Sequence, residues 1–190
     1  MMDVSDTELM SRLAAGDDLM LNTIMTRWSG RVSSFLFRMT GQRETAIDLA
    51  QETFVKLYRA RSRYKPQGHF STYLFAIAAN LARNHSRWLS RHPTVSLDCV
   101  DSDGAAGYSE PADPKQTPGE VALAREKSAI VNRAILSLAV DQREALTLFL
   151  YEGLSYAQIA ELTHCSPKAV ETRIYRARQI LKEQLKELRP

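Results

Sequence analysis

Apolar residues recur every three or four positions along most of this chain, and no stretch alternates apolar with polar residues as a half-buried strand does. Leu21, Ile24, Trp28 and Val32 begin one such stripe, and no proline interrupts the chain before Pro66. This spacing places the apolar residues of each segment on one face of a helix, and that face must pack against other helices. The sequence therefore predicts an all-α protein.

Local signals for helix starts and stops predict four helices in the first part of the chain. Ser5 with Glu8 forms a capping box, Asp17 or Asp18 caps the next helix, and Ser71 caps the last. The expected helices cover residues 5–16, 17–41, 44–63 and 71–90. These four helices are interpreted as one domain, residues 1–95.

A change of composition predicts a linker after this domain. Residues 96–119 hold five acidic residues and one basic residue, three of the seven prolines and few large apolar side chains. Helical spacing resumes at about residue 120 and again over 142–152. The predicted organisation is two small helical domains, 1–95 and 119–190, joined by a flexible acidic linker, 96–118.

The C-terminal domain carries the pattern of a helix-turn-helix. Ser155 with Gln158 makes a capping box for one short helix, and Ser166-Pro167 opens a second after a three-residue break. The second helix has an apolar face and leaves polar and cationic residues outward, as a helix that enters the DNA major groove does. An ordinary surface helix is the alternative interpretation.

A stretch between Glu52 and Asp98 contains no acidic residue. Proteins that hold single-stranded or opened nucleic acid typically combine cationic side chains, which bind phosphates, with aromatic side chains, which stack on bases. A solvated basic face over ordinary core aromatics is an equal alternative. The cations and aromatics of this stretch are Lys56, Arg59, Arg61, Arg63, Lys65, Arg83, Arg87, Arg91, Phe54, Tyr58, Tyr64, Phe70, Tyr73, Phe75 and Trp88.

No catalytic or metal-binding pattern emerges from the sequence, so we expect a non-enzyme without a cofactor. The four histidines lack the spacing of a metal site, and Cys99 and Cys165, the only cysteines, are expected to be free thiols. The apolar runs are too short to cross a bilayer and no leader precedes the first helix, which predicts a cytoplasmic protein.

Three segments together resemble a known family. Residues 154–178 look like the promoter-binding helix-turn-helix of bacterial sigma factors. Residues 46–54 (AIDLAQETF) and 70–80 (FSTYLFAIAAN) are similar to the two signature stretches of the extracytoplasmic-function sigma factors. Nearly the whole chain is covered, and its compact size matches that minimal group.

The resemblance implies a sigma factor that binds core RNA polymerase, recognises promoters at a -10 and a -35 element, and promotes DNA melting. The helix around residue 50 would dock on the polymerase, and a solvated acidic pair is the alternative interpretation of Asp48 and Glu52. The polymerase-binding residues implied are Asp48, Gln51, Glu52 and Phe54.

The resemblance also implies which residues meet DNA. The loop 63–70 would form a pocket for a displaced base of the -10 element, with the helix after it facing the strand. The -10 residues are Tyr64, Lys65, Phe70, Asn80, Arg83 and Arg87. The -35 residues are Lys168, Glu171, Thr172, Arg173, Arg176 and Arg178. Two alternatives stay open here, because Asn80 would also suit a buried bracing role and Glu171 would also suit orienting Arg176 or Arg178.

Members of this family are commonly held inactive by an anti-sigma protein, so the resemblance implies such a partner as well. Two other functions are compatible with parts of the sequence. A stand-alone helix-turn-helix regulator would bind duplex DNA as a dimer, and an RNA-binding protein would prefer RNA to promoter DNA.

Overall fold

The computed structural model describes residues 4–65, 68–92 and 118–186. All regular structure in these residues is helical, which confirms the all-α prediction. The linker predicted at 96–118, with its acidic residues and Cys99, lies outside the described residues apart from Pro118. The helices are α1 (Asp6–Ala14), α2 (Leu19–Thr40), α3 (Arg43–Ala60), η1 (Arg61–Arg63), α4 (Phe70–Arg91), α5 (Pro118–Leu136), α6 (Val140–Leu150), α7 (Tyr156–Thr163) and α8 (Pro167–Gln184).

Most predicted helix ends agree with the structure. The Ser5 side chain accepts from the Glu8 amide at 3.2 Å, and α2 ends at Gly41 in the left-handed conformation. The Ser71 cap was wrong, because α4 begins at Phe70 with His69 as an N-cap that makes no side-chain bond. The Phe70 ring is buried in the core, and α4 starts at this residue, one position before Ser71. The packing of this aromatic ring therefore outweighs the capping preference of serine.

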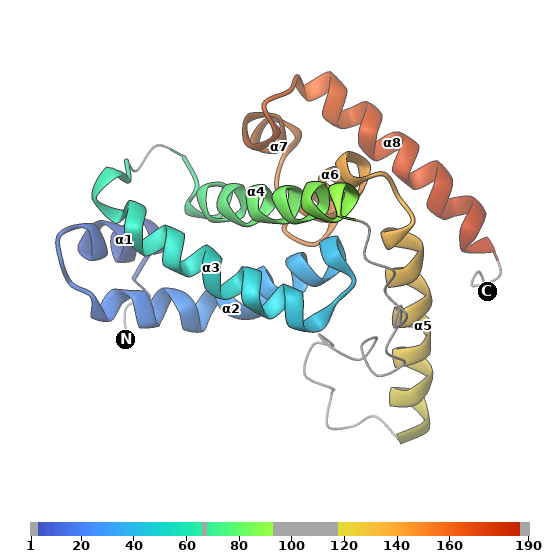
Figure 1. Cartoon of the computed structure of the whole chain (residues 1–190), viewed down its shortest axis with the longest axis horizontal. Helices are drawn as coiled ribbons and strands as arrows, with labels where there is room; N and C mark the ends of the chain where they lie inside the picture. The colour runs from blue at the N-terminus through green and yellow to red at the C-terminus, as the bar shows by residue number, and fades with distance from the viewer. Residues whose placement is uncertain (1–3, 66–67, 93–117, 187–190) are drawn as a thin grey trace.

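Helices α1 to α4 form the N-terminal half of the molecule (Figure 1). Helix α2 packs against α1, α3 and α4, so its apolar stripe forms the centre of this half. Trp28 lies edge-on to the rings of Phe70 and Phe75, with centroid distances of 5.7 and 6.1 Å. This aromatic contact fixes α4 across the N-terminal part of α2.

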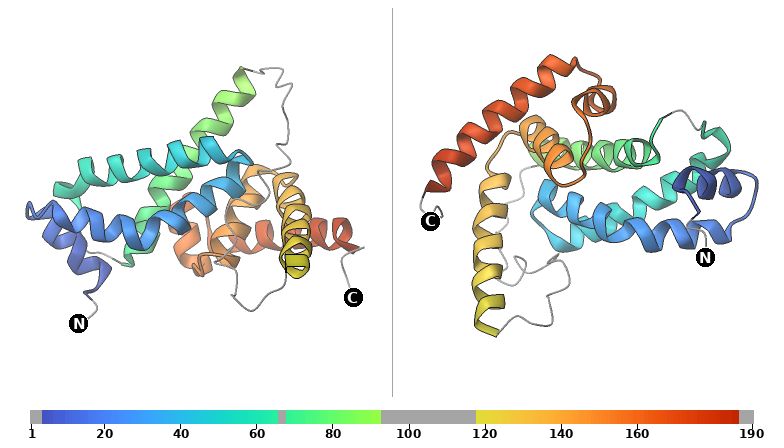
Figure 2. Two further views of the ribbon diagram at one scale, coloured as in Figure 1. Left: turned by 90° about the horizontal axis from the view of Figure 1, so that it is seen from below. Right: turned by 180° about the vertical axis from the view of Figure 1, so that it is seen from behind.

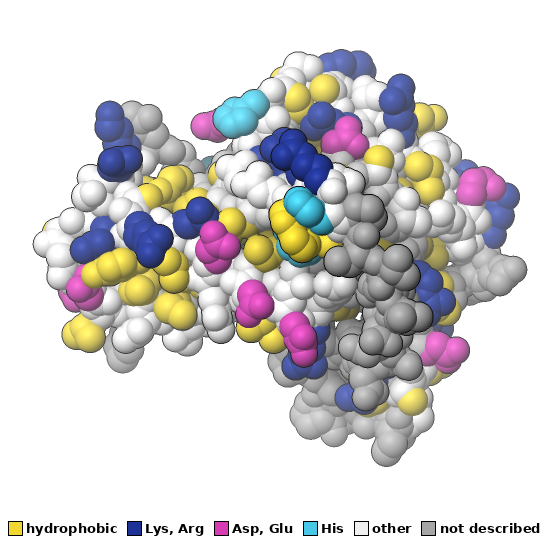
Figure 3. Space-filling view, viewed as in Figure 1, with side chains coloured by type: hydrophobic (Ala, Val, Ile, Leu, Met, Phe, Trp, Pro, Cys, Tyr) yellow, Lys and Arg dark blue, Asp and Glu magenta, His cyan; other side chains and the backbone are white. Residues whose placement is uncertain are grey.

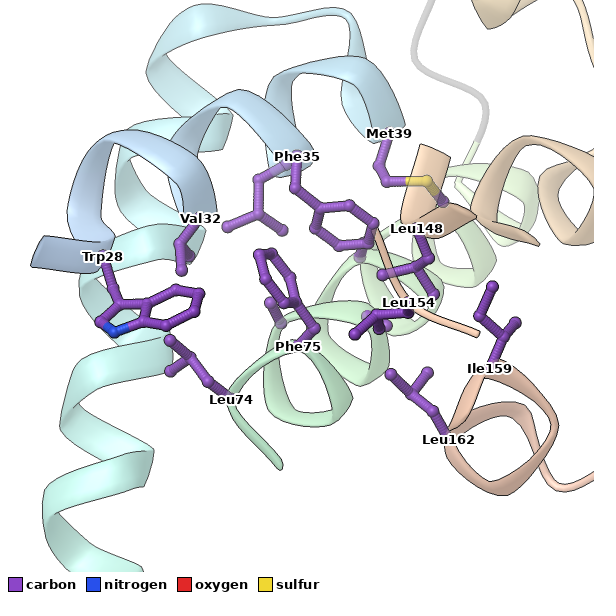
Figure 4. Packing of buried hydrophobic residues seen from close by; sticks show 14 of the residues in the cluster. Trp28, Val32, Phe35, Met39, Leu74, Phe75, Leu148, Leu154, Ile159 and Leu162 are labelled. Carbon is purple, nitrogen blue, oxygen red and sulfur yellow. The ribbon is translucent and has the colours of Figure 1, made fainter. Parts of the chain in front are cut away.

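Helices α5 to α8 form the C-terminal half, which packs against the N-terminal half. Helices α6 and α7 contact α4, and α5 and α6 contact α2, while α8 lies on the outer side (Figures 1 and 2). Figure 4 shows Phe35 and Phe75 from the N-terminal half beside Leu148 and Leu154 from the C-terminal half. The described residues therefore bury their apolar side chains in one continuous core that spans both halves.

Arg143 ties the two halves together at the ends of two helices. Its Nη1 donates to the Met39 carbonyl oxygen of α2 at 2.6 Å. Its Nη2 donates to the carbonyl oxygens of Leu136 and Leu138, the latter at 3.0 Å. Carbonyls at helix C-termini lack partners within their own helix, so this guanidinium supplies donors that the helix ends need.

Gly41 occupies a position at the α2–α5 junction that disfavours any side chain. Its φ of 76° is left-handed, and an added Cβ would lie 2.8 Å from Leu136 Cδ1 of α5. Gly41→Ala should lower the free energy of unfolding by about 1–2 kcal/mol, because an L side chain is strained in this conformation. Chemical denaturation measures the effect.

Gly30 provides the matched control, because it lies inside α2 and an added Cβ meets nothing within 4 Å. Gly30→Ala should raise the free energy of unfolding by up to about 1 kcal/mol through its better helix propensity. Equal effects of the two substitutions would contradict this account of the α2–α5 junction.

Candidate nucleic-acid interface

The helix-turn-helix predicted from the sequence is present in α7 and α8. The Ser155 Oγ accepts from the Gln158 amide at 3.3 Å, and the Gln158 side chain accepts from the Ser155 amide at 2.8 Å. His164 turns the chain with a φ of 54°, and Ser166 then caps α8 with Pro167 in the first turn. Each helix therefore starts at its own cap, with a tight turn between them.

Helix α8 has one buried face and one outward face. Val170, Ile174 and Ala177 are buried against the rest of the C-terminal half. Four of the predicted -35 residues are exposed, namely Lys168, Glu171, Arg176 and Arg178. Thr172 and Arg173 are half-buried, so the helix presents a mixed row of cations, hydroxyl and carboxylate to solvent.

Several of these side chains already have partners. Lys168 Nζ lies 2.8 Å from Glu171 Oε2, and Arg173 Nε lies 3.2 Å from Asp141 Oδ2. The Arg178 guanidinium sits 5.3 Å from the centre of the Phe149 ring. Glu171 therefore pairs with Lys168, whereas within the described chain Arg176 has no ion-pair partner.

Tyr175 is a candidate contact that the sequence analysis did not single out. Its side chain is 62% exposed, and it stands one helical turn from Glu171 and Thr172 at the centre of the outward face. Its side chain combines an apolar ring with a polar hydroxyl, so it can contact both apolar and polar groups of a partner. The sequence could have indicated this residue, because the helical period places Tyr175 opposite Val170 and Ala177, which are buried.

The predicted -10 residues divide between surface and core. Lys65, Asn80 and Arg87 are exposed, so Asn80 does not brace the interior. Tyr64 is half-buried, with its ring 5.1 Å from that of Tyr73, and Phe70 is only 4% exposed. The Phe70 ring therefore supports α4 from inside and is not accessible in this structure.

A cavity lies between α3 and α4, next to the loop predicted to hold a base. Its volume is about 270 Å³, and Asn80 is the predicted -10 residue on its wall. Of the loop itself, Pro66 and Gln67 lie outside the described residues. The lining residues are Lys56, Ala60, Tyr73, Ile77, Asn80, Leu81 and Asn84.

Arg83 points away from solvent and toward the C-terminal half. Its Nη1 lies 3.1 Å from Glu144 Oε1, and its Nη2 donates to the Asn80 side-chain oxygen. The Glu144 side chain is 3% exposed and that of Arg83 is 19% exposed. Two predicted -10 residues are thus linked to a buried carboxylate that the sequence analysis did not single out.

Burial changes the acidity of two glutamates at the contact between the halves. Loss of solvent raises the pKa of Glu144 to about 7, although Arg83 and Arg173 oppose the shift and Asp141 adds to it. Burial also raises the pKa of Glu152, and the attraction of Arg31 opposes that rise. Both carboxylates therefore bind a proton more readily in the folded protein than in the unfolded chain.

The residues predicted to bind polymerase lie on α3. Asp48, Gln51 and Glu52 are exposed, and Glu52 Oε1 lies 3.4 Å from Lys56 Nζ. Acidic side chains follow the line of α3 in Figure 3, while basic ones lie at the η1 end of this helix and above α4. Phe54 is 4% exposed and packs in the core, so it holds the acidic face of α3 in place.

The described ranges contain no cluster of histidine, cysteine and acidic residues that would hold a metal ion. Cys165 is a half-buried free thiol whose Sγ lies 3.1 Å from Thr163 Oγ1 in the turn before α8. None of the helices described here is long and apolar enough to cross a membrane.

Comparisons with known proteins identify the two halves separately. The family model described as "Sigma-70 region 2" matches residues 24–92, and "Sigma-70, region 4" matches residues 128–181. The chain is 33% identical over 187 residues to the ECF RNA polymerase sigma-E factor of Escherichia coli strain K12, covering 97% of this chain and 96% of that one.

Two solved structures have the same fold. The first is CnrH in complex with the cytosolic domain of CnrY, with a TM-score of 0.70, 24% identity and coverage of 96% of this chain and 97% of that chain. The second is the sigma factor RpoE in complex with the anti-sigma factor NepR from Bartonella quintana, with a TM-score of 0.65, 22% identity and coverage of 87% and 96%.

The raised pKa of Glu144 predicts how stability varies with pH. The protonated carboxyl favours the folded protein, so this contribution is complete below the usual pKa of 4.5 and is lost as pH rises through about 7. The free energy of unfolding should fall by about 1 kcal/mol from pH 6.5 to pH 8 through this group alone.

Urea denaturation of the wild-type protein and of Glu144→Gln at both pH values measures this contribution. The amide does not titrate, so the fall should be smaller by about 1 kcal/mol in the variant. Glu152 titrates in both proteins and accounts for a remaining fall. An identical pH dependence in the two proteins would show that Glu144 has an ordinary pKa.

Proposed function

Because this chain belongs to the extracytoplasmic-function group of the sigma-70 factors, we propose that its N-terminal half reads the -10 element and its C-terminal half reads the -35 element. A sigma factor binds core RNA polymerase and directs it to promoters, and the polymerase carries out the chemistry. One observation carries the proposal: the same chain joins a capped helix-turn-helix to a helix, α4, that has exposed arginines and borders a cavity lined by Tyr73 and Asn80. We assign residues 1–95, 96–118 and 119–190 to the first domain, the linker and the second domain.

For the -35 element, the outward face of α8 suits the major groove of duplex DNA. Arg176 offers a bidentate donor to a guanine edge, and the Tyr175 ring offers an apolar contact to a thymine methyl group. Lys168, Arg173 and Arg178 suit phosphates, which position the helix without reading sequence. The Lys168–Glu171 pair opens when Lys168 turns to a phosphate, which frees Glu171 to accept from a cytosine amine.

For the -10 element, the cavity between α3 and α4 suits a base displaced from the duplex. Asn80 and Asn84 supply amide groups to a base edge, and Tyr73 supplies a ring for stacking. Arg87 and Lys65 are exposed for the phosphates of the opened strand. Tyr64 supports the Tyr73 ring, and Phe70 fixes the start of α4 in the core.

For core polymerase, the exposed acidic face of α3 is the proposed contact. Asp48 and Glu52 are four residues apart, so they stand on one face and repel each other in isolation. A basic partner surface would offset that repulsion, with Gln51 between the two carboxylates. Both side chains of the Glu52–Lys56 pair are about half exposed, so the partner can displace Lys56 at little cost.

We also propose control by an anti-sigma protein. One of the similar structures is titled as a sigma factor with its anti-sigma factor, and its fold matches most of this chain. The place of action is the cytoplasm, where polymerase and promoter DNA meet.

Run-off transcription tests the proposed function. Sigma-free core polymerase, fragmented genomic DNA from the source bacterium and this protein should give discrete start sites that share two upstream motifs. The control is a polymerase preparation that responds to a known sigma factor. If such a preparation gives no specific start sites with this protein, the chain is a stand-alone regulator or an RNA-binding protein instead.

Arg176→Ala should weaken binding to duplex DNA that carries the mapped -35 motif by about 1–3 kcal/mol, roughly fivefold to more than a hundredfold, because a bidentate base contact is lost. Arg133→Ala on α5, which removes the same charge from another exposed site, should change this affinity little. Gel-shift titration measures both, and a similar loss in the two variants would mean that Arg176 contributes only general charge.

Asp48→Arg should lower the affinity for core polymerase at least about tenfold, because charge reversal on α3 repels a basic partner surface. Glu126→Arg on α5 makes the same change at an exposed position outside that face. Fluorescence titration against core polymerase compares the two, and unchanged affinity of Asp48→Arg would remove α3 from the proposed interface.

A further inference from the structure

Arg173 of α8 forms an ion pair with a different helix. Its Nε lies 3.2 Å from Oδ2 of Asp141, which stands in the first turn of α6. The positive charge of Arg173 also opposes the rise in the pKa of Glu144, one turn further along α6. The Arg173 guanidinium is therefore attracted to two carboxylates of α6, and Asp141 is the one in contact with it.

One terminal nitrogen of Arg173 is directed toward the turn of the helix-turn-helix. Arg173 Nη1 lies 3.6 Å from Sγ of Cys165, the residue that precedes the N-cap Ser166 of α8. A thiol sulfur is only a weak acceptor, whereas a phosphate oxygen forms charge-assisted hydrogen bonds with a guanidinium. A phosphate can therefore replace the sulfur as the partner of Nη1. This end of α8 also carries Lys168, which is exposed.

A guanidinium can hold a carboxylate and a phosphate at the same time. It carries five N–H donors in one planar fork, so a carboxylate beside Nε leaves donors on the terminal nitrogens for another anion. A long side chain that is free in solution loses rotamer freedom when it binds DNA. The contact with Asp141 restricts Arg173 before DNA arrives, which lowers that cost.

We propose that Asp141 is a positioning residue for DNA binding, whose carboxylate holds the Arg173 guanidinium in place to bind a phosphate of the -35 duplex. This inference rests on the proposed role of α8 at the -35 element.

The charge of Asp141 distinguishes positioning from general electrostatics. Its side chain is 53% exposed, so a carboxylate close to the DNA repels the phosphates. On charge alone, removal of this carboxylate should tighten DNA binding. Positioning of Arg173 predicts the opposite sign, because the guanidinium is then no longer held in place.

Asp141→Asn tests the proposal by fluorescence titration of the full chain with a labelled duplex that carries the mapped -35 motif. The variant should bind this duplex about twofold to tenfold more weakly than the wild-type protein, which is the cost of ordering one long side chain. Glu161→Gln removes the same charge from an exposed position of α7 and should not weaken binding.

The same substitution in an Arg173→Ala protein separates positioning from a structural role. Without the arginine, Asp141 is only a repulsive charge, so Asp141→Asn should leave the affinity unchanged or tighten it. Arg173→Ala alone should reduce the slope of log affinity against log salt concentration by about 0.9, the value for one lost phosphate contact.

Thermal unfolding followed by circular dichroism checks that each variant folds. The Asp141–Arg173 pair is partly exposed, so its loss should change stability little. Asp141→Glu keeps the carboxylate and should retain most of the wild-type affinity. Should Asp141→Asn fail to fold, Asp141→Ser removes the same charge and keeps an oxygen in the first turn of α6.

Three results would overturn the proposal. The first is an Asp141→Asn protein that binds the duplex as tightly as the wild-type protein or more tightly. The second is equal weakening by Asp141→Asn with and without Arg173, and the third is an unchanged salt slope in Arg173→Ala. Absence of specific start sites with the wild-type protein would overturn the sigma function and this inference with it, whereas the three results above would leave the sigma function intact.

Discussion

The arrangement of this molecule depends on apolar burial that neither half completes alone. Phe35 and Phe75 of the N-terminal half lie against Leu148 and Leu154 of the C-terminal half, and all four are nearly inaccessible to solvent. Burial of such side chains contributes roughly 1.5–3 kcal/mol each. Because the halves share this surface, core packing sets the orientation of α8 relative to α4.

The polar groups at the edge of that core connect stability with function. Arg143 satisfies carbonyls at the ends of two helices, and the Arg83–Glu144 and Arg31–Glu152 pairs border the apolar contact. Buried ion pairs contribute little net stability but are costly to break on one side only. The two pairs therefore set how the halves meet more than they add to stability.

Local signals made much of the fold predictable. The capping box at Ser155 and the Ser166-Pro167 start fixed α7 and α8 because helix caps act over three residues. The same periodicity placed Val170 inside and Arg176 outside. Contacts between distant residues were not predictable in this way: Arg83 and Glu144 are 61 positions apart, so nothing in either local sequence indicates the other. The burial of Phe54 and Phe70 likewise depends on packing against helices from elsewhere in the chain.

Helix α8 packs on α6 and α7, which pack on α4, whereas the proposed -10 and -35 elements lie apart along the duplex. One chain that reads both elements must therefore separate its two halves. Spin labels at Leu19→Cys and Glu183→Cys, with Cys99 and Cys165 replaced by serine, would report the separation of the two halves by pulsed electron spin resonance. The distance should be single and short in the free protein and should lengthen by tens of ångströms in the complex with core polymerase and promoter DNA. An unchanged distance in an active complex would contradict the claim.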